Sequence, residues 1–583
     1  MKQIYFIILL ISGCVNGYAQ DLKFGWARNE GGYGNELGGE SITIDLNGYI
    51  YVAGAIDTTA FFIDEPGIQN WSTIRANDIF IQKYDSEGTK LWETQIGSEY
   101  NTTEFAKSIV TDNNNDVYVT GNYNSSAVDF DPGPGIFKLD GIGTFFLKLD
   151  QNGNFIWAKE IEGNGNSITH SINIDHNNDI YVSGNFRGTL DFDLGQNELN
   201  LTSIDESYAD LDSFILKLNS DGELIWVKTI ENDSNIRKET ISTLDDLGNI
   251  YIAGTFRGQI DFDPNDGVFN LTSSASSDSG FIVKLDKNGN FVWAKDIIGG
   301  NPWISSITVD DFGNLYSTGH FSGTTDFNPN NGSAILTSTN GSVYGDSLNS
   351  FILKLDINGN FKFVKQIEGD WVESSVIVTD FLGNIYTSGS IDGNADLDPN
   401  EGVYNVTPDI QYGSGIFFQK LSANGNFLWG AQISNSSLNH LTRSMIMDDS
   451  SESLYVTGRF MGGKMDFDPS AEVNNLYTKG GRYNYDLFVL KLENNVLTVN
   501  DFHLADNFEI YPNPNNGNFT IDFKTFLNKA KISVLDELGR VVHQSDYQNI
   551  NRIYINFNNY SKGFYFVEIK TSIGKQSIPI IKK

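Results

Sequence analysis

The sequence predicts an all-β protein: a seven-bladed β-propeller followed by a small immunoglobulin-like β-sandwich. Three observations predict this fold class. A short apolar run that ends in glycine, such as IYIAG ending at Gly254, occurs seven times at spacings of 63 to 70 residues. Each copy contains four short segments rich in β-branched and aromatic residues. The repeat stops near Asn500, where the composition changes. A fixed period of this length indicates repeated copies of one supersecondary unit.

Each repeat reads as four antiparallel strands. In the third copy the first three expected strands are residues 171–175 (SINID), 180–184 (IYVSG) and 214–218 (FILKL), and the fourth contains Trp226. Asp-x-x-Gly joins the first pair of strands and Asn-Gly joins the second pair in most copies, and these residues suit tight hairpin turns. No helical pattern interrupts the repeats, so a closed ring of four-stranded sheets is the expected arrangement.

The two ends of the repeat region predict how the ring closes. The fourth strand carries a tryptophan in most copies (Trp92, Trp157, Trp226, Trp293 and Trp429), with Phe363 in one copy. The seventh copy has no such strand after residue 495, but residues 24–32 (FGWARNEGG) match one. We therefore expect this N-terminal strand to complete the last blade, which removes two exposed sheet edges.

The run DDLGNIYIAGTF and its copies resemble the bacterial seven-bladed β-propeller repeat, whose core reads approximately GNxYVTGxT. The resemblance covers about residues 21–498 and implies a fold, since that family carries no single agreed activity. The domain limits that we expect are 1–19 for a leader, 20–498 for the propeller, 499–507 for a linker and 508–583 for a second domain.

Residues 1–19 have the features of a secretory signal peptide. Lys2 precedes an apolar core from Ile4 to Ile11, and Gly17-Tyr18-Ala19 offers a cleavage site. The apolar run is too short to span a bilayer. The alternative is lipidation at Cys14, because Ile11-Ser12-Gly13-Cys14 is similar to a lipobox. Cys14 is the only cysteine, so neither alternative leaves a disulfide.

The C-terminal segment differs from the repeats in charge and motif. Residues 508–583 carry a net charge of +4, whereas residues 1–507 carry −39. The segment resembles the type A C-terminal sorting domain of the type IX secretion system. The residues that match its landmarks are Tyr511, Pro512, Asn513, Pro514, Gly517, Asp536, Gly539, Gly563, Lys582 and Lys583.

The resemblance implies export across the outer membrane by the type IX machinery, followed by removal of the domain by a sortase. The protein would then be attached at the cell surface or released. The alternative is an accessory sandwich that stays attached.

Catalytic motifs are scarce. The six histidines are scattered without metal-ligand spacing, and no nucleophile elbow, phosphate-binding loop or dinucleotide fingerprint occurs in a suitable context. We therefore assign no catalytic residue, expect no cofactor and expect a monomer. The acidic charge disfavours nucleic acid as a partner, because phosphate contacts require Lys and Arg.

An acidic Asp-x-Asp motif follows the second strand of most copies and is the candidate binding feature. We expect these motifs to ring the face that carries the long loops. Their carboxylates could help to hold Ca²⁺, and the alternative is a structural Asx turn that ends the strand. The residues are Asp129, Asp131, Asp191, Asp193, Asp261, Asp263, Asp326, Asp396, Asp398, Asp466 and Asp468.

Two functions remain open from the sequence. The first is a non-catalytic module that binds an extracellular protein or glycan through the long-loop face. The second is an extracellular polysaccharide hydrolase or lyase with an acidic site near the axis. A channel lined by carboxylates with His or Tyr would favour the enzyme, and a plugged channel would favour the binding module.

Overall fold

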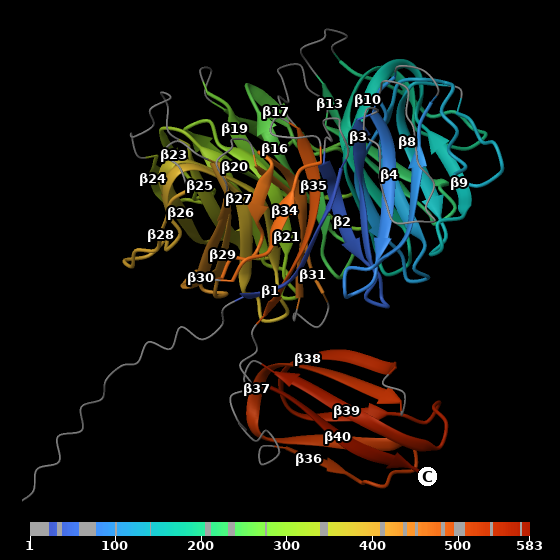
Figure 1. Ribbon diagram of the computed structural model, residues 1–583, viewed down its shortest axis with the longest axis vertical. Helices are drawn as coiled ribbons and strands as arrows, with labels where there is room; N and C mark the ends of the chain where they lie inside the picture. Colours follow the sequence, from blue (N-terminus) through green and yellow to red (C-terminus); the bar gives the residue numbers. More distant parts are fainter. Residues whose placement is uncertain are drawn as a thin grey trace, which may run out of the picture. The chain divides into compact units, whose positions relative to one another are not determined.

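The computed structural model shows an all-β protein without a helix among the residues that it describes (Figure 1). The described residues are 22–31, 38–57, 77–98, 102–139, 141–204, 211–230, 239–273, 277–338, 348–408, 414–434, 440–448, 453–470, 472–479, 484–494, 508–536, 540–571 and 574–583. The leader, Cys14, the linker 499–507 and Gly539 lie outside these ranges. In the described part of the chain, no helix is long and apolar enough to cross a membrane. Contacts divide the chain into two compact units, Met1–Asn495 and Val496–Lys583.

The first unit consists of four-stranded antiparallel sheets. The first sheet contains β2 (Gly38–Ile44), β3 (Ile50–Asp57), β4 (Asn77–Tyr84) and β5 (Lys90–Ile96). The second contains β6 (Phe105–Thr111), β7 (Val117–Tyr123), β8 (Gly143–Leu149) and β9 (Phe155–Glu160). The third contains β10 (Glu162–Ile174), β11 (Ile180–Asp191), β13 (Asp212–Leu218) and β14 (Leu224–Ile230). The fourth contains β15 (Ile241–Leu244), β16 (Ile250–Phe256), β19 (Ser279–Leu285) and β20 (Phe291–Gly299).

The remaining three sheets follow the same order. The fifth contains β21 (Trp303–Val309), β22 (Leu315–Phe321), β25 (Asn349–Leu355) and the first half of β26 (Phe361–Thr379). The second half of β26 is the first strand of the sixth sheet, with β27 (Ile385–Asp396), β29 (Ser414–Leu421) and β30 (Phe427–Ser434). The seventh contains β31 (Leu441–Met447), β32 (Ser453–Met461), β35 (Tyr485–Asn494) and β1 (Leu22–Glu30). Each first strand contacts the first strand of the next sheet, and β31 contacts β2. The sheets therefore form a closed ring, and the predicted β-propeller class is confirmed.

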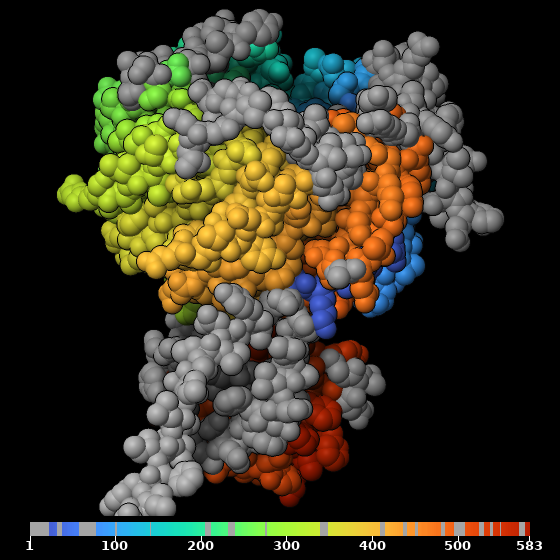
Figure 2. All heavy atoms as spheres, turned by 60° about the vertical axis from the view of Figure 1, so that its left-hand side comes forward, coloured from blue at the N-terminus to red at the C-terminus, as the bar shows by residue number. Residues whose placement is uncertain are grey.

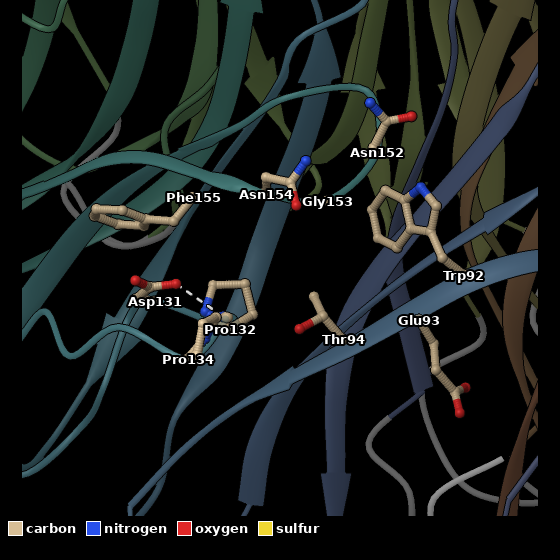
Figure 3. Close-up of a pocket in the computed structure, with 11 residues that line it drawn as sticks. Trp92, Glu93, Thr94, Asp131, Pro132, Pro134, Asn152, Gly153, Asn154 and Phe155 are labelled. Carbon is tan, nitrogen blue, oxygen red and sulfur yellow. Dashed lines mark hydrogen bonds between the residues drawn. The ribbon is translucent and has the colours of Figure 1, made fainter.

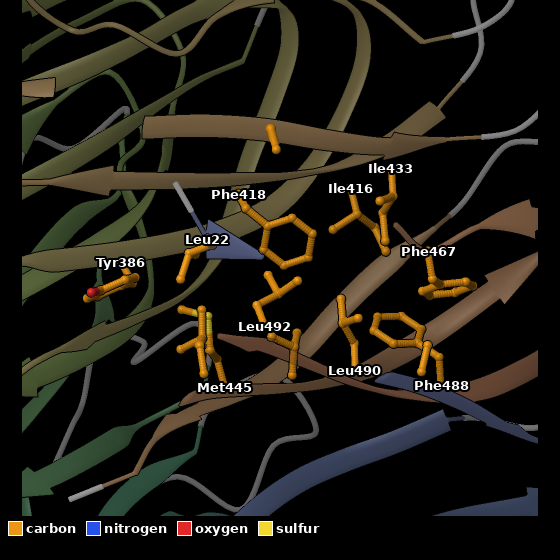
Figure 4. Close-up of a cluster of buried hydrophobic side chains, with 14 of the residues drawn as sticks. Leu22, Tyr386, Ile416, Phe418, Ile433, Met445, Phe467, Phe488, Leu490 and Leu492 are labelled. Carbon is orange, nitrogen blue, oxygen red and sulfur yellow. The ribbon is translucent and has the colours of Figure 1, made fainter. Parts of the chain in front are cut away.

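The N-terminal strand fastens the ring. β1 pairs antiparallel with β35, with Trp26 opposite Lys491 and Asn29 opposite Phe488. Leu22 belongs to the apolar cluster of the sixth and seventh sheets, where it lies close to Leu492 (Figure 4). Figure 2 shows the dark blue N-terminal strand against the orange seventh sheet. Pairing of the two ends leaves no open edge between the first and last repeats.

A cluster of one Asp, one Tyr and one Lys occurs in each sheet, where the first strand turns into the second. In the first sheet, Asp45 Oδ1 accepts hydrogen bonds from the N–H groups of Asn47 and Tyr49, and its Oδ2 accepts one from Tyr51. Lys83 Nζ lies 3.9 Å from Asp45 and donates to the Gln151 carbonyl of the next sheet. We call this end of the ring the turn end, and the opposite end the mouth.

The turn-end clusters are repeated around the ring. Their members are Asp45, Tyr51 and Lys83; Asp112, Tyr118 and Lys148; Asp175, Tyr181 and Lys217; Asp245, Tyr251 and Lys284; Asp310, Tyr316 and Lys354; Asp380, Tyr386 and Lys420; and Asp448, Tyr455 and Lys491. Burial and the nearby carboxylate raise the pKa of these tyrosines, as at Tyr316, so the hydroxyls stay protonated donors. Each cluster therefore joins a turn to the body of its own sheet, and in several sheets also to the neighbouring sheet.

Short hairpins follow the second strands of several sheets. They are formed by β12 (Asn200–Thr202) with β11, β17 (Gln259–Asp261) with β18 (Asn270–Thr272), β23 (Thr324–Asp326) with β24 (Ile335–Thr337), β28 (Asn405–Val406) with β27, and β33 (Lys464–Asp466) with β34 (Asn475–Tyr477). At the hairpin tip of the fourth sheet, Asn265 donates to the Gly289 carbonyl, in the turn between the third and fourth strands. It also accepts a hydrogen bond from Lys228 of the preceding sheet. These hairpins therefore run along the rim of the ring towards the turn end, as β28 does in Figure 1.

The second unit is a β-fold of its own. Its strands are β36 (Phe508–Tyr511), β37 (Asn518–Asp536), β38 (Val541–Asn556), β39 (Gly563–Thr571) and β40 (Gly574–Lys582). β37 pairs with β36, β38 and β39, and β39 pairs with β40. Alternate residues such as Phe519, Ile521 and Ile532 form a separate apolar core. The immunoglobulin-like type stays a prediction.

Candidate binding site at the channel mouth

A central cavity of about 830 Å³ is lined by the first strand of every sheet. In six of these strands the pairing register skips one residue, always at the same place in the repeat. The skipped residues are Glu40, Lys107, His170, Ser305, Ser375 and Arg443, and all of them line the cavity. A β-bulge leaves one residue out of the ladder and re-aims its side chain. The bulges therefore present one polar side chain to the channel from each of six sheets.

The bulged residues lie towards the mouth of the channel, because the first strand runs from the mouth to the turn end and the Asp of the turn end follows each bulged residue five residues later. Glu40 precedes Asp45 in this way, and Arg443 precedes Asp448. In the fourth sheet β15 begins after the equivalent position, and Glu239 lines the cavity there instead. Trp303, His320 and Glu373 complete the polar and aromatic part of the mouth.

Ion pairs fix part of the mouth. Lys107 Nζ lies 3.4 Å from Glu239 Oε1 and 3.9 Å from Glu40 Oε2. Arg443 Nε lies 3.3 Å from Glu40 Oε1. Burial alone would raise the pKa of Glu239, but the positive charge of Lys107 opposes this, and the pKa of Glu239 lies below the ordinary value. Glu239 is therefore an anionic partner of Lys107.

His170 is a neutral group in this setting. Burial lowers its pKa to about 4, against the opposing influence of Glu239. Its Nε2 lies 2.9 Å from Asn185 Oδ1, which accepts the imidazole N–H in the neutral tautomer that this contact selects. The imidazole is thus an uncharged hydrogen-bonding group at neutral pH.

An aromatic pair lies on the other side of the mouth. The rings of Trp303 and His320 are stacked, with centroids 5.6 Å apart and planes 27° from parallel. Both rings line the cavity. A flat aromatic surface beside several fixed polar groups is typical of a site for a polar ligand with an apolar face.

The acidic motifs predicted from the sequence are turn formers at the rim, not a ring at the mouth. Asp261 Oδ1 accepts hydrogen bonds from the N–H groups of Asp263 and Phe269, and Asp263 Oδ1 accepts one from Asn265. Between the two aspartates, Phe262 is fully buried against Phe256 and Phe281. The expected placement on the long-loop face is wrong, because the connection folds back as a hairpin.

The same hydrogen bonds recur at the equivalent residues. The first aspartates are Asp129, Asp191, Asp326, Asp396 and Asp466, and each accepts two backbone N–H groups. The second aspartates are Asp131, Asp193, Asp398 and Asp468, and each accepts one. Within the described ranges, no three His, Cys, Asp or Glu side chains gather as a metal site would need. Calcium binding stays a prediction without a ligand cluster to support it.

Sequence reasoning missed the mouth residues. They carry no common residue type, and a bulge cannot be seen in a pattern of alternation. Their signal is positional: the fifth residue before the turn-end Asp is polar in all seven repeats, with Thr240 in the fourth.

The landmark residues of the tail meet at one end of the second unit. Asn513 donates to the Pro579 carbonyl and accepts from the Ile581 N–H. Lys582 Nζ donates to the carbonyls of Phe557 and Asn558 from a buried position. Gly563 lies opposite Lys582, and Lys583 N donates to the Asn515 carbonyl.

The other tail landmarks are also placed. Tyr511 donates to Asp522, Gly517 has a positive φ of 112°, and Asp536 accepts the N–H of Arg540. Pro512 and Pro514 lie between Tyr511 and Asn515. The segment from Tyr511 to Gly517 is thus tied to the last strand of the chain.

Comparisons with known families identify both parts. Residues 509–583 match the secretion system C-terminal sorting domain, and residues 91–126 match the β-propeller repeat. The chain is a β-propeller repeat protein with a type IX sorting domain. The sorting domain makes it a secreted or cell-surface protein and is consistent with handling by the type IX secretion machinery.

A curated relative of this β-propeller repeat protein is an uncharacterized WD repeat-containing protein, L264, from Acanthamoeba polyphaga mimivirus. The two are 24% identical over 534 residues, which cover 77% of this chain. The match spans only 37% of the length of the relative.

Solved structures give distant similarities. The mitotic checkpoint complex contains a chain that matches with a TM-score of 0.37 and 7% identity, over 78% of this chain and 95% of that one. A DUF4221 family member from Bacteroides vulgatus matches with a TM-score of 0.30 and 11% identity, over 82% and 99%. The extracellular domain of the two-component system protein BT3049 from B. thetaiotaomicron matches with a TM-score of 0.16 and 12% identity, over 96% and 100%.

Proposed function

We propose that this secreted propeller is a non-catalytic binding module that holds a neutral glycan at the channel mouth. The observation that carries the proposal is the set of bulges that directs a polar side chain from each of six sheets into one cavity. Bulges are over-represented next to functional sites, where they re-aim side chains.

The chemistry of the mouth favours an uncharged polyhydroxylated ligand. Lys107 and Arg443 are each paired with a carboxylate of the site, so neither offers an uncompensated positive charge to a polyanion. Paired ions and a neutral imidazole still offer donors and acceptors to hydroxyl groups. The stacked Trp303 and His320 rings provide a flat surface for the apolar face of a sugar ring.

The enzyme alternative has one observation in its favour. The cavity is lined by Glu40, Glu239 and Glu373 together with His170, and carboxylates beside a histidine are what an enzyme site would contain. Against it, a general acid needs a carboxyl whose pKa is raised towards neutrality, and the pKa of Glu239 is lowered. We therefore propose binding and retain hydrolysis as an outcome of the test.

The test uses the full-length protein on a glycan array and on a panel of soluble polysaccharides. We expect binding to neutral glycans that falls at least tenfold in Trp303→Ala and in Glu40→Gln. Leu247→Ala, an exposed substitution at the turn end, is the matched control and should bind like the wild type. Binding that survives both mouth substitutions would contradict the proposal. New reducing ends that disappear in Glu239→Gln would instead support the hydrolase.

We also propose that the sorting domain is removed after export and that the leader is cleaved after Ala19. Mass spectrometry of the mature protein tests both. A C-terminus upstream of Phe508 is expected, and an N-terminus at a lipidated Cys14 would support the alternative leader.

A further inference from the structure

A second cavity, of about 330 Å³, lies on the rim between the first and second sheets (Figure 3). It is lined by Trp92 and Thr94 of the first sheet and by Asp131, Pro132 and Gly153 of the second, among other residues. At most other junctions of the ring, a side chain of the protein itself fills the equivalent place.

At several junctions, the glycine of the turn between the third and fourth strands packs against the indole ring of the tryptophan of the preceding sheet. A methyl group added to Gly289 would come within 3.4 Å of the Trp226 ring, and one added to Gly153 within 3.4 Å of the Trp92 ring. The indole N–H of Trp92 donates to the Gln151 carbonyl of the same turn, 3.2 Å away. The contact therefore forms one wall of a rim slot at each of these junctions.

Five junctions fill the slot with a cation from their own chain, two residues after the aromatic residue. These cations are Arg28, Lys159, Lys228, Lys295 and Lys365. Lys159 Nζ donates to the Gly222 carbonyl at 2.8 Å, and Arg28 Nε donates to the Gly88 carbonyl at 2.9 Å. The stems pass over the turn glycines, since a methyl group on Gly359 would lie 2.8 Å from Lys295 Cε.

The hairpin of the following sheet provides the partner of this cation. Lys228 Nζ donates to Asn265 Oδ1 at 2.9 Å, and Lys365 Nζ donates to Asn400 Oδ1 at 2.7 Å. Lys159 also lies in the electrostatic field of Asp193, the second aspartate of its hairpin. The slot is thus built for a primary ammonium group on an alkyl stem.

The junction between the first and second sheets has the slot but not its occupant. Thr94 stands where five other sheets have a lysine or arginine, and Gly133 stands where three hairpins have Asn265, Asn330 and Asn400. The walls remain, with the Trp92 ring on one side, Asp131 on the other and Gly153 above (Figure 3). A threonine side chain is too short to reach the place of a lysine ammonium. The cavity is the space that a lysine side chain would fill.

We propose that this slot binds a lysine side chain presented by an extracellular partner protein. The chain itself supplies the precedent, because the same walls hold its own lysines or arginine at five junctions. In this slot Asp131 provides the charge that compensates the ammonium. The face of the Trp92 ring receives the cation, as the Trp157 ring receives Lys159 Nζ at 5.8 Å from its centroid. The Gly153 carbonyl is equivalent to the Gly222 carbonyl, which accepts a hydrogen bond from Lys159. The net charge of −35 draws basic partners to the surface.

The experiment uses the full-length protein with Nα-acetyl-lysine methylamide as the probe. Saturation-transfer NMR detects the bound probe, and the ¹⁵N indole resonance of Trp92, assigned with Trp92→Phe, locates it. We expect millimolar binding with a shift of this resonance, and at least tenfold weaker binding of the norleucine analogue, which lacks only the ammonium. Equal binding of the two probes, or no response at Trp92, would overturn the proposal. Binding of cadaverine without binding of the lysine amide would also overturn it.

Two substitutions test the slot in opposite directions. Thr94→Lys supplies the missing side chain and should abolish binding of the probe while leaving the fold intact, as judged by an unchanged or higher Tm. Lys228→Thr opens the slot between the third and fourth sheets and should add a second bound equivalent. If Lys228→Thr fails to fold, Thr94→Lys alone decides, because unchanged binding in that variant contradicts the assignment.

Discussion

The two ends of the propeller ring use the repeat in opposite ways. At the turn end, the same Asp, Tyr and Lys recur in every sheet, as in Asp45, Tyr51 and Lys83. At the mouth, the equivalent position holds Glu40, Lys107, His170, Thr240, Ser305, Ser375 or Arg443. Most of the turn-end groups are buried, and in six sheets the Tyr hydroxyl donates to the Asp, so a change leaves a polar group without its partner. The mouth side chains face a cavity, and each sheet can change its own without repacking. The difference indicates that the residues which hold the ring together are the same in every sheet, whereas the residues that line the mouth differ between sheets.

The largest loss of stability is expected when a turn-end carboxylate is removed, and this substitution tests the comparison most directly. Asp310 accepts hydrogen bonds from the N–H groups of Phe312 and Asn314 and from the Tyr316 hydroxyl. Asp310→Ala leaves these buried donors unpaired, and we expect a loss of about 3 to 4 kcal/mol in the free energy of unfolding. Urea denaturation measures it, with Ser305→Ala at the mouth of the same strand as the control. A loss below about 1 kcal/mol would show that the cluster is not needed for stability.

The free energy of unfolding should depend on pH because of His170 at the mouth. The folded pKa of His170 is about 4, below the ordinary value of 6.5. The unfolded chain therefore binds a proton more readily, and stability contributed by the neutral imidazole is present above pH 6.5 and is lost as the pH falls towards 4. We expect this residue to account for about 2 kcal/mol, less than the full shift because His170 lines the cavity and is only partly buried. Denaturation of wild type and His170→Asn between pH 7 and pH 4 should converge as the pH falls, and parallel curves would contradict the assignment.

A milder substitution sharpens the account of the turn end. Tyr316→Phe removes one hydroxyl donor but keeps the buried ring, and Asp310 keeps its two backbone donors. The expected loss is about 1 kcal/mol in the free energy of unfolding, measured by the same denaturation. The equivalent change at Tyr386 should cost a similar amount, because Tyr386 donates to Asp380 in the same way.

The smallest effect is expected from calcium at the rim. The carboxylates of the acidic motifs already accept backbone N–H groups, as Asp261 does from Asp263 and Phe269. We expect Tm values in EDTA and in millimolar Ca²⁺ to agree within about 1 °C, with Mg²⁺ as the control. A calcium-specific rise of several degrees would restore the metal site that the sequence suggested.

Regular elements of the fold could be predicted from the sequence, because they repeat. The Trp26 strand was recognisable by its match to the fourth strands of other repeats, and β1 indeed pairs with β35. The rim hairpins were missed because Asn270-Leu271-Thr272 is too short to show alternation. The acidic motifs were consequently placed on the wrong face. The mouth was invisible because a bulge depends on strand pairing, which a single copy does not reveal.

One consequence of the ring closure concerns presentation. Leu22 lies opposite Asn494, and Asn494 accepts a hydrogen bond from Tyr386 at the turn end. Both ends of the propeller chain therefore emerge from the same side of the seventh sheet. A segment joined to the chain beyond Asn494 would be attached at the turn end of the propeller. The mouth would then lie at the end of the propeller away from this attachment, where dissolved ligands could reach it.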